Sequence, residues 1–384
     1  MRRKYPLDHK GRCVIHLPFR AYGREQWLLT CYNRGEVMNV YSLNDRILGC
    51  LIGAGAGDAM GAATESRTTE QILQYFGHKV TDFEVTPMDT FAKGNQPGQA
   101  TDDFSSAYFI TRHIIDHDGE ITSEVVKEAL IDWSEHPIFF DRFAGPTTRM
   151  AIRRYKGEEI PESDAIQLLP RQATNGAAMK IAPIGLFNPG NVDQAIYDAA
   201  VVTMVTHDNY LAISGGSAVA AAVAEAVTPD ADVYSIIQAG IYGAKEGARI
   251  GRKIGRDVAG PSVVKRIEMA VDIGLGKGTQ EEKMVEIAER IGMGLHVAEA
   301  IPSAFGFFAA GSGNPMDAII GAVNAGYDTD TVATMAGAMA GAAAFPEHFL
   351  PTMEKINGFE IRKTADDVEW IAGIRQKRGE QNVR

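Results

Sequence analysis

The stretch LNDRILGCLIGAGAGDAMGAA at residues 43–63 decides the fold class of this chain. It is strongly apolar, and glycine recurs at every fourth position, at Gly49, Gly53, Gly57 and Gly61. In an α-helix this spacing places the glycines along one face, where a neighbouring backbone can approach closely. The preceding SLND at residues 42–45 is typical of a capped helix start. The stretch therefore predicts a buried helix with one bare face.

Two further segments share this preference for small residues: Ala333, Gly337 and Gly341, and the alanine-rich stretch that follows Ser214. Such segments are typical of helices packed tightly inside a bundle. The charged segments 122–135 and 280–291 have helical patterns and are expected in an outer layer. Strand signals are sparse beyond residue 44, and no internal repeat indicates a solenoid. We predict an all-α fold, a compact multi-helix bundle.

The first 44 residues differ from the rest of the chain. They hold eight basic groups against three acidic ones, although the whole chain has a formal charge of -11. They lack helical periodicity, so we expect a small non-helical or β-containing N-terminal extension. It is either a cap over the core or an arm that binds a partner. The predicted boundaries are 1–44 for this extension, 45–375 for the main domain and 376–384 for a polar tail.

Composition and charge exclude several classes of protein. The 384 residues are 45% hydrophobic, which suffices for a large core. The negative net charge disfavours nonspecific binding to nucleic acid or to an anionic membrane. Neither a secretory signal nor an apolar segment long enough to span a membrane is found, and the three cysteines form no CxxC pair. We expect a cytoplasmic protein without nucleic-acid or membrane partners.

Three acidic clusters interrupt apolar or small-residue sequence, where an unpaired carboxylate is costly to bury. The first is Asp58, with Glu65 seven residues on and so two helical turns further along nearly the same face. The second is Thr101-Asp102-Asp103, which precedes an apolar helical pattern. We expect Thr101 to be the N-cap of that helix and both aspartates to lie in its first turn.

The third cluster is GYDTDT at residues 326–331, just before the glycine- and alanine-rich segment near the C-terminus. On a continuous helix Asp328 and Asp330 would diverge by about 200°, because successive residues are about 100° apart. From an extended or looped segment they can point the same way. We therefore place both in a loop before the helix.

Together the clusters hold five aspartates and one glutamate, with no Lys or Arg inside them. Like charges gathered in one place either take up protons or bind cations. Carboxylate and hydroxyl oxygens suit Mg²⁺, Mn²⁺ or Ca²⁺ better than Zn²⁺. Two divalent ions would balance four of the negative charges. Taken singly, each cluster is more often an ordinary helix cap, loop or turn, but their joint occurrence favours a metal site.

Two other motifs are weaker indications of a binding site. His113 and His117 stand one helical turn apart and can in principle pair on a metal ion, although a solvated helix face is the commoner role of such a pair. The GxGxG pattern at residues 53–57 is similar to a dinucleotide fingerprint, but Asp58 stands where the third glycine belongs and no clear strand precedes it. We therefore discount a dinucleotide site.

The order of these motifs resembles that of the ADP-ribosylglycohydrolase family, over roughly residues 45–345. The matching stretches are GDAMG with the following glutamate, TDD at 101–103, TNGAAM at 174–179, TH at 206–207 and GYDTDT at 326–331. The resemblance implies an all-helical fold around a binuclear magnesium centre, and a hydrolase that acts on ADP-ribose.

The resemblance also implies roles for particular residues. Two Mg²⁺, or Mn²⁺, would be held by six ligands: Thr101, Asp102, Asp103, Asp328, Asp330 and Thr331. Glu65 would lie on a mobile loop over the site and contact the metal or the ribose, and Asp102 or Asp103 would handle the proton. The diphosphate would be bound by backbone groups of Asn175, Gly176 and Ala177, and His207 would lie near the adenosine.

The implied reaction is hydrolysis of the N-glycosidic bond between ribose and an arginine side chain of an ADP-ribosylated protein. Serine-linked and O-acetyl ADP-ribose are alternative substrates. Bacterial relatives include immunity proteins that oppose ADP-ribosylating toxins, so stoichiometric binding of such a toxin through residues 1–44 is a further alternative. Some family positions differ here: Phe104 follows the Asp-Asp pair, Lys180 ends the Asn-Gly loop, and Phe143 stands where some members carry an acid.

Overall fold

The structure is a computed structural model that describes residues 41–162, 173–343 and 347–381. Within these ranges the chain forms helices and turns, and its β-structure is limited to two isolated bridges between single residues. The predicted all-α class is therefore confirmed for the described residues. The predictions for residues 1–40, the bulk of the N-terminal extension, lie outside them. Residues 41–384 group into one compact unit.

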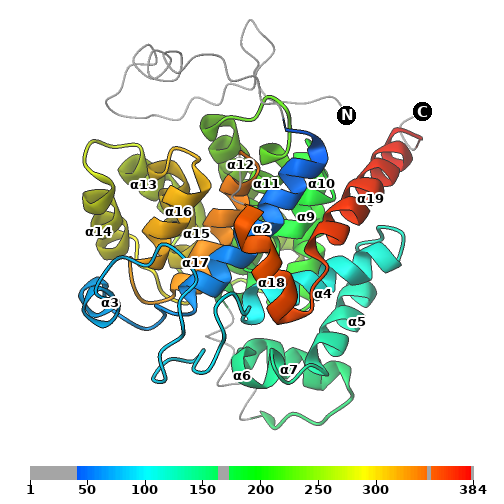
Figure 1. The fold of residues 1–384 in the computed structure, drawn as a ribbon. Helices are drawn as coiled ribbons and strands as arrows, with labels where there is room; N and C mark the ends of the chain where they lie inside the picture. Colours follow the sequence, from blue (N-terminus) through cyan, green and yellow to red (C-terminus); the bar gives the residue numbers. More distant parts are fainter. Residues whose placement is uncertain (1–40, 163–172, 344–346, 382–384) are drawn as a thin grey trace, which may run out of the picture. The chain divides into compact units, whose positions relative to one another are not determined.

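The helices are, in chain order, α2 (Leu43–Gly61), α3 (Thr69–Phe76), α4 (Asp102–Asp116), α5 (Ser123–Ser134), α6 (Phe140–Phe143), α7 (Pro146–Tyr155), η2 (Asn175–Ala177), α9 (Ala182–Leu186), α10 (Val192–Met204), α11 (Tyr210–Ala226), α12 (Val233–Ile254), α13 (Val263–Gly274), α14 (Gln280–Arg290), α15 (Val297–Ala310), α16 (Pro315–Val323), α17 (Thr329–Gly341), η3 (Glu347–Phe349), α18 (Leu350–Asn357) and α19 (Ile361–Gln381). Nearly every residue of α2, α11, α15 and α17 is buried, so these four form the core. In Figure 1, α13 and α14 lie to one side of them and α4, α5 and α19 to the other.

The bare face of α2 packs directly against α17. A Cβ atom added at Gly57 would lie 2.3 Å from the carbonyl oxygen of Ala333, and one added at Gly337 would lie 2.2 Å from that of Gly53. These contacts are with backbone atoms, which explains why the facing positions are glycine or alanine. The predicted close approach is confirmed. The capping box that starts α2 is also present, since Ser42 Oγ accepts from Asp45 N at 3.1 Å.

This packing gives a testable prediction. Replacing Gly57 by alanine should destabilise the protein by about 3 kcal/mol, because the Ala333 carbonyl belongs to a helix backbone and cannot rotate away. Gly373 in α19 is the matched control, since a Cβ there meets no atom within 4 Å. Alanine at position 373 should be neutral or slightly stabilising. Urea denaturation of both variants measures the difference, and equal midpoints would contradict the close approach.

The two charged segments form the expected outer helices. Thr122 caps α5 and Thr279 caps α14, and each helix buries only part of its surface. Helix α19 extends to Gln381, so residues 376–381 of the predicted polar tail continue the last helix. Among the described helices, none combines the length and the apolar character needed to cross a membrane.

Candidate metal centre

Acidic side chains from three separate helices or their ends meet in one buried place. Asp58 lies in α2, Asp103 in the first turn of α4 and Asp330 in the first turn of α17, and one oxygen of each lies within 4.8 Å of the others. Glu65 and Asp328 form a second group of this kind with the same Asp330. The three clusters identified in the sequence therefore share one volume, which we call the carboxylate centre.

Asp58 fixes the start of α4. Its carboxylate accepts hydrogen bonds from Thr101 Oγ1 at 2.7 Å, from Thr101 N at 3.0 Å and from Phe104 N at 3.0 Å. Thr101 is the N-cap of α4, as predicted, and its Oγ1 also accepts from Asp103 N at 3.3 Å. A carboxylate at a helix start meets N–H groups that have no partner within the helix. Helix α2 thus positions both Asp102 and Asp103.

The prediction that Asp328 and Asp330 both lie in a loop is wrong for Asp330. Asp328 is the N-cap of α17, whereas Asp330 already lies in its first turn. Their carboxylates nevertheless approach each other, because the backbone of Asp328 departs from helical geometry, with φ of -96° and ψ of 65°. Across the centre, Thr331 Oγ1 donates to Asp103 Oδ1 at 3.2 Å, which links α17 to α4.

The helical position predicted for Glu65, two turns along the same helix as Asp58, is also wrong, whereas the non-helical position over the site that the resemblance implied agrees with the structure. Helix α2 ends four residues before Glu65, which lies half-buried in the turn that follows. A main-chain hydrogen bond from Ser66 N to Tyr327 O, 2.7 Å long, ties this turn to the segment before α17. It is this tie, rather than helical periodicity, that brings Glu65 to the centre.

Burial and mutual repulsion raise the pKa values of these acids. Desolvation, followed by repulsion from Asp330, raises the pKa of Asp58 to about 7, that of Asp102 to about 8 and that of Glu65 to about 10. The same two causes raise the pKa of Asp103 well above its ordinary value. Without a cation, the centre therefore retains protons at neutral pH.

The donor atoms fit hard divalent cations. Asp103 Oδ2 is buried and has no hydrogen-bond partner among the described residues. Such an oxygen is costly to leave unpaired, and a cation is a natural partner for it. The surrounding donors are carboxylate and hydroxyl oxygens, which suit Mg²⁺, Mn²⁺ or Ca²⁺.

Lys180 is a buried cation beside the centre, and its role was not anticipated from the sequence. It is 1% exposed, and its Nζ donates to the carbonyl oxygen of Gly176. Desolvation lowers the pKa of Lys180 to about 8, against the attraction of Asp102 and Asp103. In the described parts of the chain no carboxylate oxygen lies within 4.0 Å of its Nζ. One ammonium group cannot balance five ionised aspartates and a glutamate, so bound cations or protons must balance the rest of the charge.

The Asn-Gly loop forms the short 3-10 turn η2 beside the centre. Asn175 Nδ2 donates to Asp328 Oδ2, a contact that the sequence did not indicate. The main-chain N–H groups of Asn175 and Ala177 already donate to Leu295 O at 2.8 Å and Thr174 O at 3.3 Å. Of the three amides expected to bind a diphosphate, only that of Gly176 has no acceptor within the described residues.

His207 lies against this turn and is buried. Its ring nitrogens contact Thr206 Oγ1 at 2.7 Å and Thr174 Oγ1 at 2.9 Å, and a Cβ at Gly176 would lie 3.4 Å from the ring. Burial, together with repulsion from Lys180, lowers the pKa of His207 well below its ordinary value. The imidazole is therefore neutral at physiological pH.

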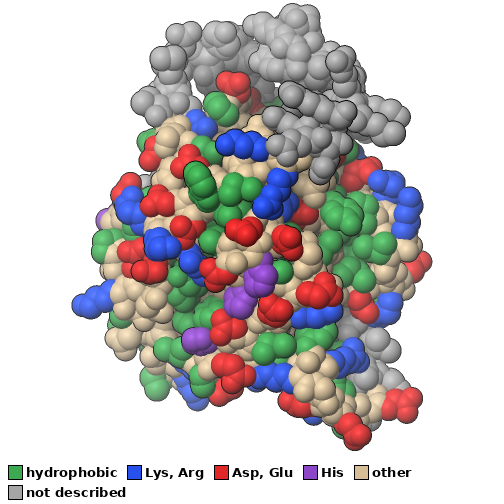
Figure 2. All heavy atoms as spheres, turned by 90° about the vertical axis from the view of Figure 1, so that its right-hand side faces the viewer, with side chains coloured by type: hydrophobic (Ala, Val, Ile, Leu, Met, Phe, Trp, Pro, Cys, Tyr) green, Lys and Arg blue, Asp and Glu red, His purple; other side chains and the backbone are tan. Residues whose placement is uncertain are grey.

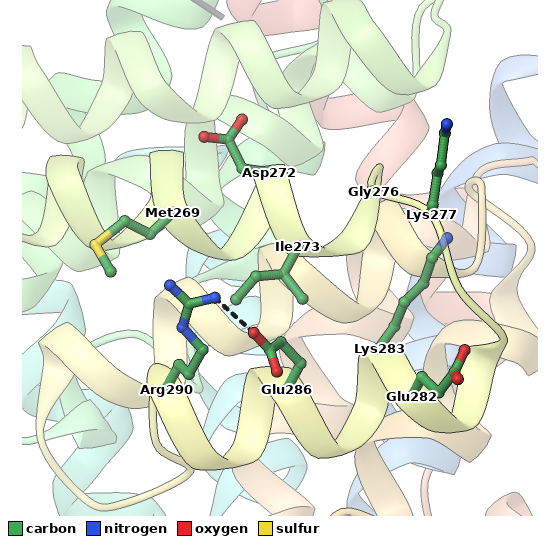
Figure 3. Close-up of a pocket in the computed structure, with 9 residues that line it drawn as sticks. All are labelled: Met269, Asp272, Ile273, Gly276, Lys277, Glu282, Lys283, Glu286 and Arg290. Atoms are coloured by element: carbon green, nitrogen blue, oxygen red, sulfur yellow. Dashed lines mark hydrogen bonds and ion pairs between the residues drawn. The ribbon is translucent and has the colours of Figure 1, made fainter. Parts of the chain in front are cut away.

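A separate cavity of about 570 Å³ lies between α13 and α14 (Figure 3). It is lined by charged side chains of both signs, among which Glu286 and Arg290 form an ion pair at 2.5 Å. None of its lining residues belongs to the three acidic clusters. Its charges can pair with one another, whereas the acids of the carboxylate centre lack such partners within the described residues, so the centre is the stronger candidate for the chemistry.

Fold and site together define an all-helical protein with a buried carboxylate centre. A family model described as ADP-ribosylglycohydrolase matches residues 39–381, and the chain belongs to the ADP-ribosylglycohydrolase family. It is therefore a hydrolase that removes ADP-ribose. The resemblance noted in the sequence is confirmed.

Several relatives support the assignment. The chain is 28% identical to the uncharacterized protein YegU of Escherichia coli (strain K12), over 87% of this chain and 98% of that one. It is 30% identical to the ADP-ribosyl-dinitrogen reductase glycohydrolase of Rhodospirillum rubrum, over 39% of this chain and 47% of that one. It is 23% identical to ADP-ribosylhydrolase ARH3 of Bos taurus, over 77% of this chain and 84% of that one. A solved ADP-ribosylglycohydrolase-related protein complex has the same fold, with a TM-score of 0.62 at 21% identity, covering 86% of this chain and 99% of that chain.

Proposed function

We propose that the chain hydrolyses the N-glycosidic bond between ADP-ribose and an arginine side chain of a modified protein, with two Mg²⁺ ions, or Mn²⁺, at the carboxylate centre. The observation that carries the proposal is the meeting of Asp58, Asp103 and Asp330 within 4.8 Å, joined by Glu65 and Asp328. The name of the Rhodospirillum rubrum relative supports an ADP-ribosylated protein as the substrate.

The proposed metal ligands are oxygen donors from the starts of α4 and α17: Thr101, Asp102, Asp103, Asp328, Asp330 and Thr331. Asp58 holds the first of these in place through the hydrogen bonds to its amide and hydroxyl. When bound, the ions would lower the pKa of a coordinated water and polarise the ribose hydroxyls. The unpaired Asp103 Oδ2 supports this assignment.

The side chains of the centre supply the remaining chemistry. A carboxylate of Asp102 or Asp103 accepts the proton of the attacking water, while Glu65 contacts the ribose from the turn tied to Tyr327. The bond between the anomeric carbon of the ribose and the guanidinium nitrogen breaks, its electron pair leaves on the nitrogen, and positive charge develops on the sugar. The water oxygen bonds to the anomeric carbon, and the proton taken up by the carboxylate passes to the released guanidine, which leaves as arginine. The fixed negative charge of the centre stabilises that oxocarbenium-like transition state.

The diphosphate of the substrate would lie at η2. Among the described residues the amide of Gly176 has no acceptor, so it would donate to a phosphate oxygen, and Lys180 contributes positive charge behind the turn. The neutral His207 ring, packed against Gly176, would lie near the adenosine. Lys180 thus offsets part of the repulsion between an anionic ligand and the carboxylate centre.

Linkage specificity is tested by incubating the protein with arginine-linked and serine-linked ADP-ribosylated proteins, and with O-acetyl ADP-ribose, in Mg²⁺ and in EDTA. We expect release of ADP-ribose from the arginine-linked protein in Mg²⁺ and none in EDTA. Cleavage of the serine O-glycoside or of the O-acetyl ester alone would contradict the arginine proposal while leaving the centre intact. Equal rates in Mg²⁺ and EDTA would contradict the metal mechanism.

The immunity proposal, in which the N-terminal residues bind an ADP-ribosylating toxin, calls for a truncation. Removing residues 1–40 keeps Ser42 and its capping box with Asp45, whereas removal through residue 44 would destroy that cap. We expect the 1–40 deletion to retain hydrolysis at the rate of the full chain and to lose binding to the toxin in a pull-down. Unchanged toxin binding would contradict a partner arm in this segment.

A further inference from the structure

We propose that α4 and α5 carry a second divalent-metal site, formed by His113, His117 and Glu128, that takes a borderline transition-metal ion such as Zn²⁺. One ligand atom from each of these residues lies within 4.8 Å of the other two. Figure 2 shows histidine side chains gathered among acidic ones on the face that carries α4, α5 and α19. This inference does not depend on the proposed hydrolysis.

The two histidines and the carboxylates come from facing sides of two helices. His113 lies in the last turn of α4 and His117, four residues on, is the C-cap of that helix. Their ring centroids are 6.3 Å apart and their planes lie within 16° of parallel. Glu128 and Asp132 have the same spacing on α5, and Asp132 Oδ2 lies 3.0 Å from His113 Nε2. An ion held here would therefore bridge α4 and α5.

The tautomer of His117 favours a cation. Its Nδ1 lies 2.8 Å from the carbonyl oxygen of His113, which can only accept, so Nδ1 carries the proton. In the neutral ring, Nε2 then has a lone pair directed at Glu128 Oε2, 3.3 Å away. Because the Nε2 lone pair and the Glu128 oxygen repel each other at 3.3 Å, this arrangement needs either a cation between the two atoms or a proton on the ring nitrogen. A backbone carbonyl that accepts from the second ring nitrogen is also the usual arrangement of metal-binding histidines.

The spacing of the His117 and Glu128 ligand atoms matches a tetrahedral ion. Bonds of about 2.0–2.1 Å from Zn²⁺ to nitrogen or oxygen place neighbouring ligand atoms about 3.3–3.4 Å apart. The observed separation of His117 Nε2 and Glu128 Oε2 is 3.3 Å. Within the described residues, neither Glu128 nor Asp132 forms an ion pair with Lys or Arg that would compete with a metal.

The donor set distinguishes this site from the carboxylate centre. Imidazole nitrogen prefers Zn²⁺ and similar ions, whereas the all-oxygen centre prefers Mg²⁺. The two sites are also well separated, because His113 lies ten residues beyond Asp103 on α4, or about 15 Å at 1.5 Å per residue. An ion at the C-terminal end of α4 would hold that helix against α5 and so stabilise the element that presents Asp102 and Asp103.

Calorimetric titration of the full chain with Zn²⁺ at pH 8, with Mg²⁺ saturating, tests the proposal. We expect one Zn²⁺ to bind, and the double variant His113→Ala/His117→Ala to weaken that binding by at least about 100-fold. Zn²⁺ should also raise the melting temperature of the wild type, by about 2–5 °C when in large excess over its dissociation constant, and should not raise that of the variant.

Two further variants keep the test decisive. His78→Ala removes a half-exposed histidine that faces Glu84 at 3.4 Å, far along the chain from this pair, and should bind Zn²⁺ like the wild type. Glu128→Gln changes one exposed side chain and should weaken Zn²⁺ binding by at least about 10-fold while the circular dichroism spectrum stays unchanged. Wild-type affinity in either the double variant or Glu128→Gln would overturn the proposal.

Discussion

Replacing Asp330 with asparagine lowers the rate of ADP-ribose release by at least about 10³-fold. Asp330 is the carboxylate shared by both groups of acids in the centre, so its charge acts on every other member. Asparagine keeps the shape of the side chain, and its Oδ1 can still accept from Thr331 N, which now donates to Asp330 Oδ1 at 2.9 Å. The change therefore removes a negative ligand with little effect on the fold. Initial rates in saturating Mg²⁺ give the measurement.

Asp103→Asn should have an effect of similar size. Its Oδ2 has no other partner within the described residues, and its Oδ1 would still accept from Thr331 Oγ1. The double variant should be little worse than either single one, because residues that act as one unit are not additive. Asp116→Asn, at the exposed end of the same helix α4, is the matched control and should keep the wild-type rate. Wild-type activity in both centre variants would refute the proposed site.

Removing divalent ions makes the stability of the protein fall as the pH rises from 6.5 to 8. In the unfolded chain the carboxyl groups have already lost their protons in this range, whereas burial and mutual repulsion let those of the folded centre retain them. Each proton that only the folded state retains lowers stability by about 1.4 kcal/mol per pH unit, or about 2 kcal/mol over this range. Several such protons would lower the melting temperature by more than about 5 °C.

The range from pH 6.5 to 8 avoids two groups whose titration changes stability in the opposite direction. The lowered pKa of His207 makes stability rise with pH below about 6.5, and the lowered pKa of Lys180 does the same above about 8. Melting temperatures in EDTA and in Mg²⁺ make the measurement, and Mg²⁺ should remove the slope because it keeps the carboxylates ionised. In EDTA, Asp103→Asn should make the fall of stability with pH less steep by about 1.4 kcal/mol per pH unit, the contribution of one proton. Identical pH profiles in EDTA and Mg²⁺ would show that no ion binds at the centre.

Helix starts could be predicted from the sequence with good accuracy. The capping box of Ser42 and the N-cap of Thr101 depend on residues within three positions of each other, so the local sequence contains the whole interaction. The contact of α2 with α17 was predictable in kind, because a four-residue glycine repeat has few uses other than close helix packing. Which helix would fill that face was not predictable from a single sequence.

The sequence by itself determined the helical class, the bare face of α2 and the acidic and hydroxyl side chains that make up the centre, because residue identity, periodicity and caps are local properties of the chain. Only the tertiary structure decided that Glu65 reaches the centre through the turn tied to Tyr327, and that Asn175 and Lys180 lie beside it. The bond from Thr331 to Asp103 spans 228 positions. Contacts of that kind depend on how helices pack, and no spacing within one segment encodes them.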